Sequence, residues 1–327
     1  MEAIVLVDGD EGVGTGFIAK IRGVNFVVTN LHVIGGNEAI RVTTVRGVPV
    51  RVAGMFGAAG RDIAILRIES EYTGPTLKLA EDPLATVKLG DKVAVVGNRR
   101  GGGVATQVSG VVQGIGPDRI EVNARFQPGN SGSPIVHVPT GEVIGVASYS
   151  QTRELDELDG PANSGAGTGA TGTRVTKEEQ RWFGYRADAV SRWEAIDLVR
   201  WRAQAKKIAD FESDSQAIHY AMYGRFKEAG GNPRVRTLID RFEERYERLG
   251  SSQVIVGQEV QEFFRGLRAL AETGVKDLKT GEYYDFFRTS LYWETSITQQ
   301  LQARAYIAER LDKASENSAA FLARVRR

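Results

Sequence analysis

The chain has 327 residues, 42% of them hydrophobic and 25% charged, which predicts one or two well-packed globular domains and excludes a disordered or collagen-like chain. Its 42 basic and 41 acidic residues give a formal net charge of +1, and no Lys/Arg block indicates nucleic acid or anionic lipid as a partner. The absence of cysteine excludes disulfides, thiolate catalysis and cysteine-based metal sites, and three histidines are too few for a His-rich metal cluster. We therefore expect neither a metal nor an organic cofactor.

The N-terminal part of the chain, residues 1–153, is expected to be all-β. Between residues 3 and 152, short runs rich in Val, Ile and Gly are separated by Gly, Asp, Asn or Pro; examples are AIVLV, GFIAKI, NFVVTN, IAILRI and KVAVVGN. Short β-branched runs bounded by turn residues are typical of antiparallel strands in a sandwich or barrel.

A change in composition separates this part from the rest of the chain. The tract GPANSGAGTGATGT, residues 160–173, has almost no apolar bulk to bury and is typical of a flexible linker or long loop. We place the linker at residues 154–175 and expect an α-helical domain over residues 176–327.

Four helical segments are expected in the C-terminal domain. Thr176 and Glu179 form a capping-box pattern where the first would begin, and Asn232 followed by Pro233 is the favoured order at a helix start. The segments run from Thr176 to Gly230, from Pro233 to Gly250, from there to Gly274, and over about residues 281–324. Helical segments of this length predict an antiparallel bundle or paired long helices.

The stretch QPGNSGSPIV, residues 127–136, concentrates Gly, Asn, Pro and Ser around Ser131. A serine hydroxyl becomes a nucleophile when a base, usually a histidine oriented by a carboxylate, takes its proton. His32 and His137 are the histidines of the β part, and either one alone would more often be structural. Asp62 begins a strongly apolar strand, where a charge needs a hydrogen-bonded partner, so it is the candidate carboxylate.

Three motifs in this order, TNLHV around His32, RDIAIL around Asp62 and PGNSGSP around Ser131, resemble the signatures of trypsin-like serine proteases, and most closely those of the HtrA (Deg) branch. A fourth stretch, LGDKVAVVGNRRGGGVATQVSGVV, is similar to that branch's segment between the aspartate and the serine. The resemblance covers residues 3–152. It implies two six-stranded antiparallel barrels with a crossover near residues 80–90, hence an all-β double barrel followed by an α-helical C-terminal domain.

The resemblance also implies the role of each catalytic residue. Ser131 attacks the scissile carbonyl, His32 takes the proton and returns it to the leaving amine, and Asp62 fixes the imidazole tautomer. The backbone amides of Gly129 and Ser131 form the oxyanion hole, which stabilises the negative charge on the carbonyl oxygen.

Substrate-binding residues follow from the same resemblance. The stretch GVASYS is similar to the strand that pairs with the substrate backbone, which assigns Ser148 to the catalytic carboxylate and Tyr149 and Ser150 to the substrate channel. Counting back from the nucleophile, Arg125 falls near the base of the primary pocket and Phe126 at its wall.

The orientation of Arg125 sets the expected specificity. An arginine that points into the pocket would favour an acidic residue before the scissile bond, because a buried guanidinium needs a carboxylate partner. An arginine that points to solvent would leave a small apolar pocket beside Phe126, suited to aliphatic residues. We favour the second interpretation.

Two departures from the family pattern limit what carries over. Digestive-type relatives mature when a new N-terminal amine pairs with an aspartate before the serine, and the neutral Asn130 at that position makes this activation route unexpected. The HtrA branch usually carries PDZ domains after the protease, whereas residues 176–327 are expected to be helical. We assign them a docking, oligomerisation or regulatory role, which would give a homo-oligomer or a complex with a partner protein.

The leading hypothesis is a serine endopeptidase that hydrolyses peptide bonds through a Ser-His-Asp triad and an acyl-enzyme. Its substrates would be polypeptides, either unfolded or partner proteins. The alternative is a catalytically silent or latent protease fold that binds peptides, or acts as a chaperone, under the control of the helical domain.

The sequence leaves the compartment open. No window approaches about 18 uninterrupted apolar residues, so we expect no membrane span. The N-terminus lacks a basic stretch followed by an apolar signal core, which favours a cytoplasmic location for the chain as it stands. The strand-like AIVLV so close to Met1 would equally follow a trimmed leader, which would place the protein in the periplasm or outside the cell.

Overall fold

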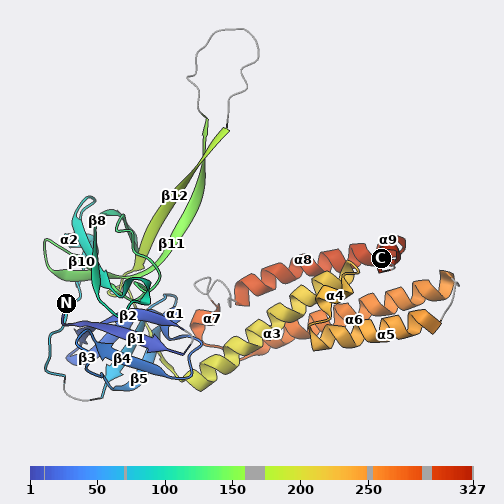
Figure 1. The fold of residues 1–327 in the computed structure, drawn as a ribbon, viewed down its shortest axis with the longest axis horizontal. Helices are drawn as coiled ribbons and strands as arrows, with labels where there is room; N and C mark the ends of the chain where they lie inside the picture. The colour runs from blue at the N-terminus through green and yellow to red at the C-terminus, as the bar shows by residue number, and fades with distance from the viewer. Residues whose placement is uncertain (11, 70–71, 159–173, 249–252, 289–296, 326–327) are drawn as a thin grey trace, which may run out of the picture. The chain divides into compact units, whose positions relative to one another are not determined.

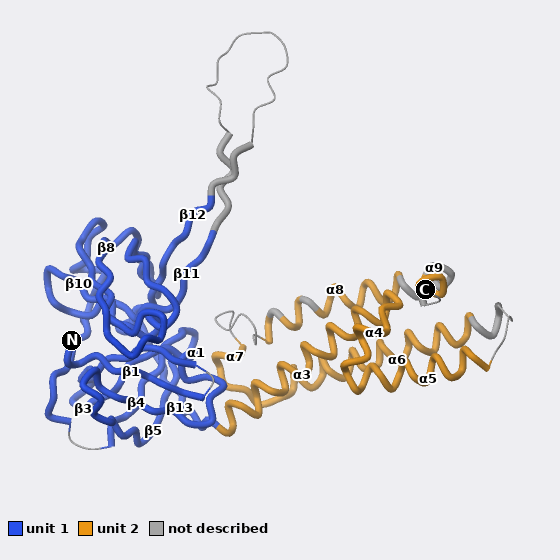
Figure 2. The backbone as a smooth tube through the Cα atoms, in the orientation of Figure 1, with its two compact units in different colours: residues 1–198 blue, residues 199–327 orange. Residues whose placement is uncertain are grey.

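The computed structural model describes residues 1–10, 12–69, 72–158, 174–248, 253–288 and 297–325. It divides into two compact units, Met1–Leu198 and Val199–Arg327, which Figure 2 shows in different colours. The first unit extends further than the expected boundary at residues 154–175, because two more strands, Arg174–Tyr185 and Trp193–Ile196, belong to it.

The first sheet of the N-terminal unit has seven antiparallel strands in the order β13-β5-β6-β3-β2-β1-β4 (Figure 1). Its strands are β1 Ile4–Gly9, β2 Val13–Ile21, β3 Val24–Thr29, β4 Ile40–Thr44, β5 Val52–Ala58, β6 Ala64–Ile68 and β13 Trp193–Ile196. Arg22 and Gly23, the two residues that join β2 to β3, both have positive φ (48° and 83°). This is the type I′ geometry that matches the twist of paired strands.

The second sheet of this unit is a closed barrel in the order β10-β11-β12-β9-β8-β7. Its strands are β7 Lys92–Gly97, β8 Thr106–Ile115, β9 Arg119–Val122, β10 Pro134–His137, β11 Glu142–Leu158 and β12 Arg174–Tyr185. Branched and aromatic residues fill its interior, among them Val95, Val112, Ile120 and Ile135. Two short helices and a 3₁₀ turn complete the unit: α1 Leu31–Ile34, α2 Pro83–Thr86 in the connection between the sheets, and η1 Arg99–Gly101.

The expected pair of six-stranded barrels therefore needs a correction. One barrel is closed, but the other sheet has seven strands with β13 and β4 at its ends. The extra strand β13 pairs with β5, and its residues, from Trp193 to Ile196, lie within the first expected helical segment, Thr176 to Gly230. At the other end, β4 exchanges hydrogen bonds with the segment that leads into β5, since Val50 N donates to Val42 O (2.8 Å).

The expected linker and first helical segment also differ from the structure. Residues 154–158 belong to β11 and residues 174–185 form β12, paired with β11 from Val146↔Tyr185 to Leu158↔Arg174. The Gly-rich tract itself, residues 160–173, lies outside the described residues. Thr176 and Glu179 thus occupy a strand rather than a helix cap, because the aromatic residues that follow them pair with β9 and β11.

The C-terminal unit is helical. Its elements are α3 Leu198–Met222, α4 Phe226–Ala229, α5 Pro233–Arg248, α6 Gln253–Thr280, α7 Asp285–Arg288, α8 Ile297–Glu316 and α9 Ser318–Val325. α6 packs against both α5 and α8, and buried aromatic and aliphatic side chains from α3, α5, α6, α8 and α9 share one core. As Asn232-Pro233 predicts, α5 begins at Pro233, and the Asn232 side chain accepts hydrogen bonds from the amides of Arg234 and Val235.

Gly274 does not end a helix, contrary to the expectation from sequence. It lies inside α6, where a Cβ atom would come within 2.8 Å of the Phe211 ring. The glycine is there to admit an aromatic side chain, so its helix-breaking tendency is outweighed by packing.

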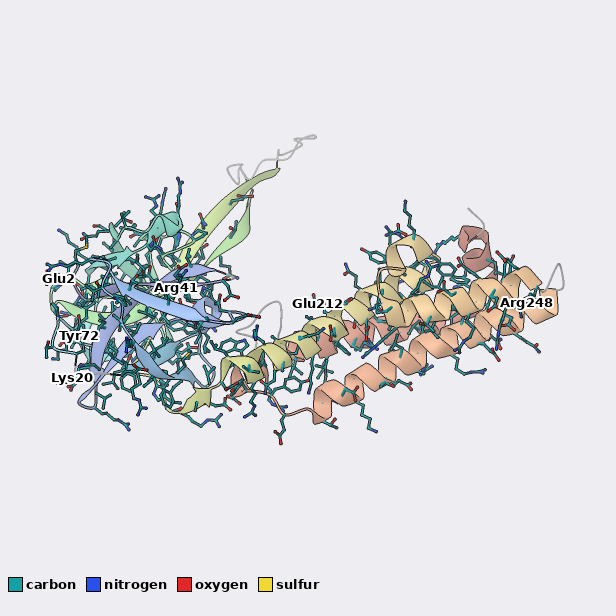
Figure 3. The ribbon with its side chains drawn as sticks, turned by 60° about the horizontal axis from the view of Figure 1, so that its bottom comes forward. Glu2, Lys20, Arg41, Tyr72, Glu212 and Arg248 are labelled. Atoms are coloured by element: carbon teal, nitrogen blue, oxygen red, sulfur yellow. The ribbon has the colours of Figure 1, made fainter. Side chains whose placement is uncertain are left out.

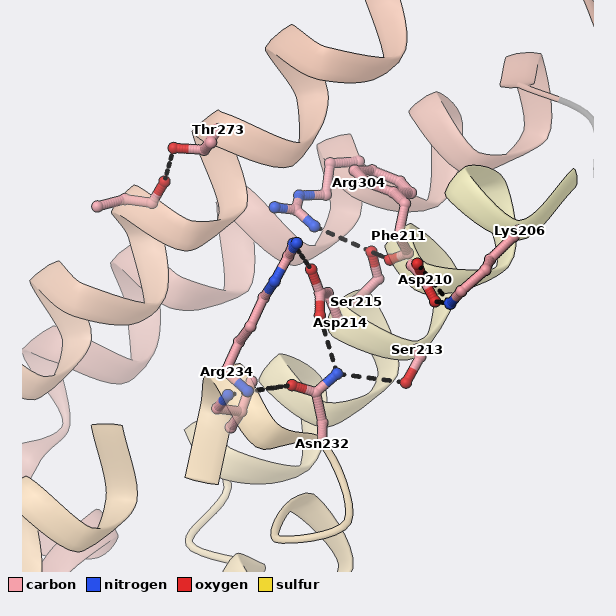
Figure 4. A network of polar contacts seen from close by, with 12 residues as sticks. Lys206, Asp210, Phe211, Ser213, Asp214, Ser215, Asn232, Arg234, Thr273 and Arg304 are labelled. Atoms are coloured by element: carbon pink, nitrogen blue, oxygen red, sulfur yellow. Dashed lines mark hydrogen bonds and ion pairs between the residues drawn. The ribbon is translucent and has the colours of Figure 1, made fainter. Parts of the chain in front are cut away.

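A buried polar network lies inside the helical unit (Figure 4). Arg304 is 4% exposed, donates to Ser215 Oγ (2.9 Å) and lies over the Phe211 ring at 5.0 Å. Burial lowers the pKa of Arg304 to about 10, although the charge of Asp214 opposes that shift. Asp214 in turn accepts from Asn232 and Arg234, both at 2.8 Å, so the network joins the start of α5 to α3 and α8.

Charged side chains of both signs lie on the outside of both units, as Glu2, Lys20 and Arg41 in the first and Glu212 and Arg248 in the second illustrate (Figure 3). Within the described residues, no helix combines the length and apolarity that a membrane crossing requires.

Candidate active site

His32 and Asp62 meet at the ends of two neighbouring strands. His32 lies on α1, the short helix after β3, and Asp62 lies two residues before the start of β6 at Ala64. β3 and β6 are paired through Thr29↔Ala64. His32 Nδ1 lies 2.6 Å from Asp62 Oδ2, and the His32 backbone amide donates to Asp62 Oδ1 (3.0 Å). The side chain of Asn30 donates to the Asp62 carbonyl oxygen (2.6 Å), which holds the two strand ends together.

Ser148 also binds the Asp62 carboxylate. Its hydroxyl donates to Asp62 Oδ2 at 2.5 Å, and both residues are more than nine-tenths buried. Ser148 lies at an irregularity in the β11–β12 pairing between Ala147 and Tyr149. Such a bulge re-aims a side chain, and here it directs the hydroxyl out of the barrel toward the first sheet.

Ser131 lies in the loop that leads into β10, close to this group. Its hydroxyl makes a hydrogen bond of 3.5 Å to the carbonyl oxygen of Ser148. Among the interactions of the described residues, none joins the Ser131 hydroxyl to His32. The structure thus brings His32, Asp62 and Ser148 into one hydrogen-bonded group and places Ser131 beside it.

Three backbone hydrogen bonds close the loop around Ser131, and two of its backbone amides take no part in them. Asn130 N donates to Gln127 O, Gly132 N to Ala147 O, and Ser133 N to Asn130 O, each at 2.9 Å. The amides of Gly129 and Ser131 donate to no acceptor within the described part of the chain. Gly129 has φ +92°, and a Cβ there would lie 2.1 Å from the Asn98 carbonyl oxygen, so this position requires glycine.

Thr15 is a residue that the sequence reading missed, and it ties the serine loop to the first sheet. Its hydroxyl donates to Gly129 O (2.7 Å) and accepts from Asn98 N (2.8 Å), while its amide donates to Ser131 O (2.8 Å). The sequence signal is Gly-Thr-Gly inside an apolar strand, because flanking glycines mark a close backbone approach.

Asn130 and His137 make local contacts instead of joining this group. Asn130 Oδ1 accepts from the Gln127 amide (3.1 Å), which closes the turn before the serine. His137 is 2% exposed, and its ring nitrogens lie 3.0 Å from Thr140 Oγ1 and 3.1 Å from Asp91 Oδ2. Of the two histidines, only His32 lies with Asp62.

Arg125 and Phe126 point in different directions. Phe126 is 6% exposed and packs in the core of the closed barrel, and its carbonyl oxygen accepts from Trp182 Nε1 (3.0 Å). Arg125 is exposed, with its guanidinium 6.0 Å from the centre of the Trp182 ring.

Tyr149 and Ser150 follow Ser148 along β11. The Tyr149 ring stacks on Phe183 at 5.2 Å, and its hydroxyl accepts from Arg119 Nη1 (3.0 Å). Ser150 is exposed and accepts a hydrogen bond from Gln180 (3.3 Å).

The protonation of His32 is set by two opposing effects. Desolvation of the imidazole disfavours its charged form, but the charge of Asp62 and the hydrogen bond to it prevail, so the pKa of His32 is raised above 6.5. The described residues contain no cluster of three or more His, Asp or Glu side chains arranged for a metal ion.

Part of the first unit is similar to known proteins. Residues 14–146 match the model of the trypsin-like peptidase domain. The serine protease Do-like HtrA of Lactobacillus helveticus is 31% identical over 160 residues, which are 45% of this chain and 37% of that protein. A probable periplasmic serine endoprotease, DegP-like, of Halomonas elongata is 26% identical over 227 residues, 62% of this chain and 44% of that protein.

The chain thus spans less than half the length of these relatives. Among solved structures, the serine endoprotease from Yersinia pestis is similar at 27% identity with a TM-score of 0.39, over 45% of this chain and 53% of that one.

Proposed function

Because residues 14–146 belong to the trypsin-like peptidase family and are similar in sequence to HtrA-type serine proteases, we propose that this chain is a serine endopeptidase. The observation that carries the proposal is the hydrogen-bonded group of His32, Asp62 and Ser148 directly beside Ser131. Its substrates would be unfolded or partner polypeptides.

In this proposal Ser131 Oγ attacks the scissile carbonyl carbon while His32 Nε2 takes the hydroxyl proton. Since His32 Nδ1 bonds Asp62 Oδ2 at 2.6 Å, the proton on the ring lies at Nδ1 and Nε2 is left as the base. The tetrahedral intermediate then expels the amine, which receives the proton from His32, and leaves an acyl ester on Ser131. Water, deprotonated by the same imidazole, releases the acyl group and restores the hydroxyl.

The two amides without acceptors, those of Gly129 and Ser131, are the proposed oxyanion donors. Three contacts fix the loop that presents them: Thr15 binds the Gly129 carbonyl, Asn98 binds Thr15, and Arg100 N donates to the Pro128 carbonyl (2.7 Å). Donors held in place before the reaction stabilise the oxyanion without reorganising, which is the source of their effect.

A latent protease is the second candidate, and one observation favours it. The Ser131 hydroxyl bonds the Ser148 carbonyl rather than His32, and this places the nucleophile off the path of proton transfer until a substrate binds. The helical unit is then proposed as the docking, oligomerisation or regulatory module. The exposure of Arg125 argues against a guanidinium buried in the primary pocket, and so supports a preference for aliphatic over acidic residues before the scissile bond.

The function is tested with a fluorophosphonate probe and with casein. The active enzyme should degrade casein and acquire one probe adduct, which peptide mass spectrometry should locate on Ser131. A latent enzyme should show neither until residues 199–327 are removed or a partner is added. Failure of both forms to cleave casein or bind the probe would contradict the peptidase proposal.

The pH dependence of kcat/KM should have its acidic limb above pH 6.5. The base must be neutral to accept the Ser131 proton, and the raised pKa of His32 means that the ring stays protonated to a higher pH than a free imidazole. Activity is thus lost as the pH falls through that raised pKa and is complete above it. A kcat/KM profile with a peptide substrate, measured from acidic to mildly alkaline pH, checks this; a limb below 6.5 would contradict the Asp62 effect.

Gly129→Ala should lower kcat by about 100- to 1000-fold, the usual cost of an oxyanion donor. The new Cβ would collide with the Asn98 carbonyl at 2.1 Å, so the loop that presents the amide must shift. Gly141→Ala is the matched control, because it shares a positive φ (71°) but its Cβ meets nothing within 4 Å. The control should lose stability and keep kcat; equal kcat losses in both variants would exclude a specific role for Gly129.

A further inference from the structure

Strand β11 runs well past the strands that flank it on one side. On that side, β10 pairs with it over Glu142–Val146, and Ala147 makes two further hydrogen bonds, to Gly132 and Ser133. On its other side, β12 accompanies it to Leu158. Within the described residues, the first edge of β11 is therefore unpaired from Ser148 to Leu158, and Figure 1 shows the two strands continuing beyond the barrel.

The unpaired edge begins at the nucleophile. The Ser148 carbonyl accepts the Ser131 hydroxyl, so it points to this edge. Backbone groups along a strand face opposite edges at alternate residues, which means that Ser150, Thr152 and every second residue to Leu158 present their N–H and C=O groups in the same direction. Ten residue steps at about 3.3 Å give an edge of roughly 33 Å.

β11 and β12 form a two-stranded ribbon, and the part of it nearest the barrel is packed on both faces. On one face Tyr149 stacks on Phe183 and Arg119 donates to the Tyr149 hydroxyl. Arg181, beside Trp182 on β12, makes a bidentate ion pair with Glu121 of β9. On the other face Trp182 is buried in the barrel core and donates to Phe126 O (3.0 Å). The direction in which β11 leaves the active site is therefore fixed by packing.

We propose that the free edge of β11, from Ser150 to Leu158, binds the polypeptide substrate as an added antiparallel strand over about ten residues before the scissile bond. This rests on the proposed peptidase function and extends it beyond the short contact at Ser148–Ser150. An exposed strand edge is a template for main-chain hydrogen bonds, and a two-stranded ribbon gains stability from a third strand. A strand paired here is continuous with the Ser148 carbonyl, so it delivers its scissile bond to Ser131.

A substrate that pairs with this edge must be an extended, unfolded chain. Main-chain pairing requires an unbroken stretch without structure of its own and without proline at the paired positions, and it places few demands on side chains. A folded protein would qualify only through a long loop or a frayed terminus.

The test uses the full chain and peptides built on one casein bond that it cleaves. The residues before that bond increase from about three to about eleven, with the rest unchanged. We expect kcat/KM to rise about 10- to 100-fold with this length, since each backbone hydrogen bond contributes modestly. In the longest peptide, N-methylation of single amides should lower kcat/KM at every second residue and have little effect between them. Length-independent cleavage, or no alternation, would overturn the proposal.

A shortened hairpin provides the matched variant. Replacing residues 154–178 with Asn-Gly keeps the pairs Thr152↔Gln180 and Arg153↔Glu179 and supplies a type I′ turn. The variant should cleave the shortest peptide at the wild-type rate, which shows an intact barrel. It should keep the gain over about the first six residues, because Ser150 and Thr152 remain, and should lose the further gain in longer peptides. An equal gain in kcat/KM with peptide length in both proteins would contradict the assignment of substrate binding to β11. A wild-type dimer that becomes monomeric in the variant would also contradict it, because the hairpin would then pair two copies of the chain. Absence of cleavage of every peptide and of casein would instead refute the peptidase function itself.

Discussion

Ser131→Ala should reduce kcat on casein-derived peptides by about 10⁴- to 10⁶-fold, the range seen when a triad serine is removed. The alanine lacks the oxygen that forms the acyl ester, and no neighbouring hydroxyl can substitute, because Ser148 Oγ is committed to Asp62 at 2.5 Å. KM should change little, since the substrate contacts proposed for β11 and for the loop amides remain. Steady-state kinetics with one peptide, together with loss of the fluorophosphonate adduct, measures both effects.

Ser133→Ala is the control for this variant. Ser133 lies two residues further along the same loop and is fully buried, and its hydroxyl has no hydrogen-bond partner among the described residues. Its removal should leave kcat within a few-fold of the wild type, whereas a loss as large as that of Ser131→Ala would mean that loop disruption explains both. His32→Ala and the Ser131→Ala/His32→Ala double variant should be no slower than Ser131→Ala alone, because the two residues act as one unit.

The meeting of His32 and Asp62 was predictable because each motif is local to a strand end. TNLHV ends β3 and RDIAIL begins β6, so pairing of these two strands suffices to bring the side chains together. Ser148 and Thr15 depend on contacts between the two sheets, across 86 and 114 residues of sequence. For Thr15, only its flanking glycines hinted at a close approach.

The strands β12 and β13 were missed because local signals there point the other way. The Thr176–Glu179 pattern is a good helix cap in isolation, yet Trp182 pairs with Val122 and Tyr185 with Arg119, more than fifty residues earlier in the chain. Strand propensity is largely a matter of such cross-strand neighbours, which a window of sequence does not contain. In the helical unit local signals are sufficient. The Asn232 side chain caps α5 within three residues of sequence, so this helix start was predictable.

Asp62→Asn should lower kcat by about 10⁴-fold at neutral pH while leaving the fold intact. An asparagine whose oxygen accepts from the His32 backbone amide, as Asp62 Oδ1 does, would place its NH2 group at the position of Oδ2, against His32 Nδ1, and the imidazole would then carry its proton on Nε2. That tautomer cannot accept the Ser131 proton. The acidic limb of kcat/KM should also move to lower pH, since the charge that raises the pKa of His32 is gone.

Comparing Ser148→Ala with Asp62→Asn separates the effect of the Asp62 charge on kcat and on the pKa of His32 from the effect of the carboxylate's orientation. The variant removes one of the hydrogen bonds to Oδ2 but keeps the carboxylate, the His32 amide bond to Oδ1 at 3.0 Å and the tautomer of the ring. Its expected loss is about tenfold, near the value of one hydrogen bond to a charged group. The acidic limb should stay above pH 6.5 in Ser148→Ala and fall only in Asp62→Asn. If both variants lost about 10⁴-fold, the Ser148 hydroxyl would itself be needed to hold the carboxylate, and Asp62 would act only when it is anchored from both sheets.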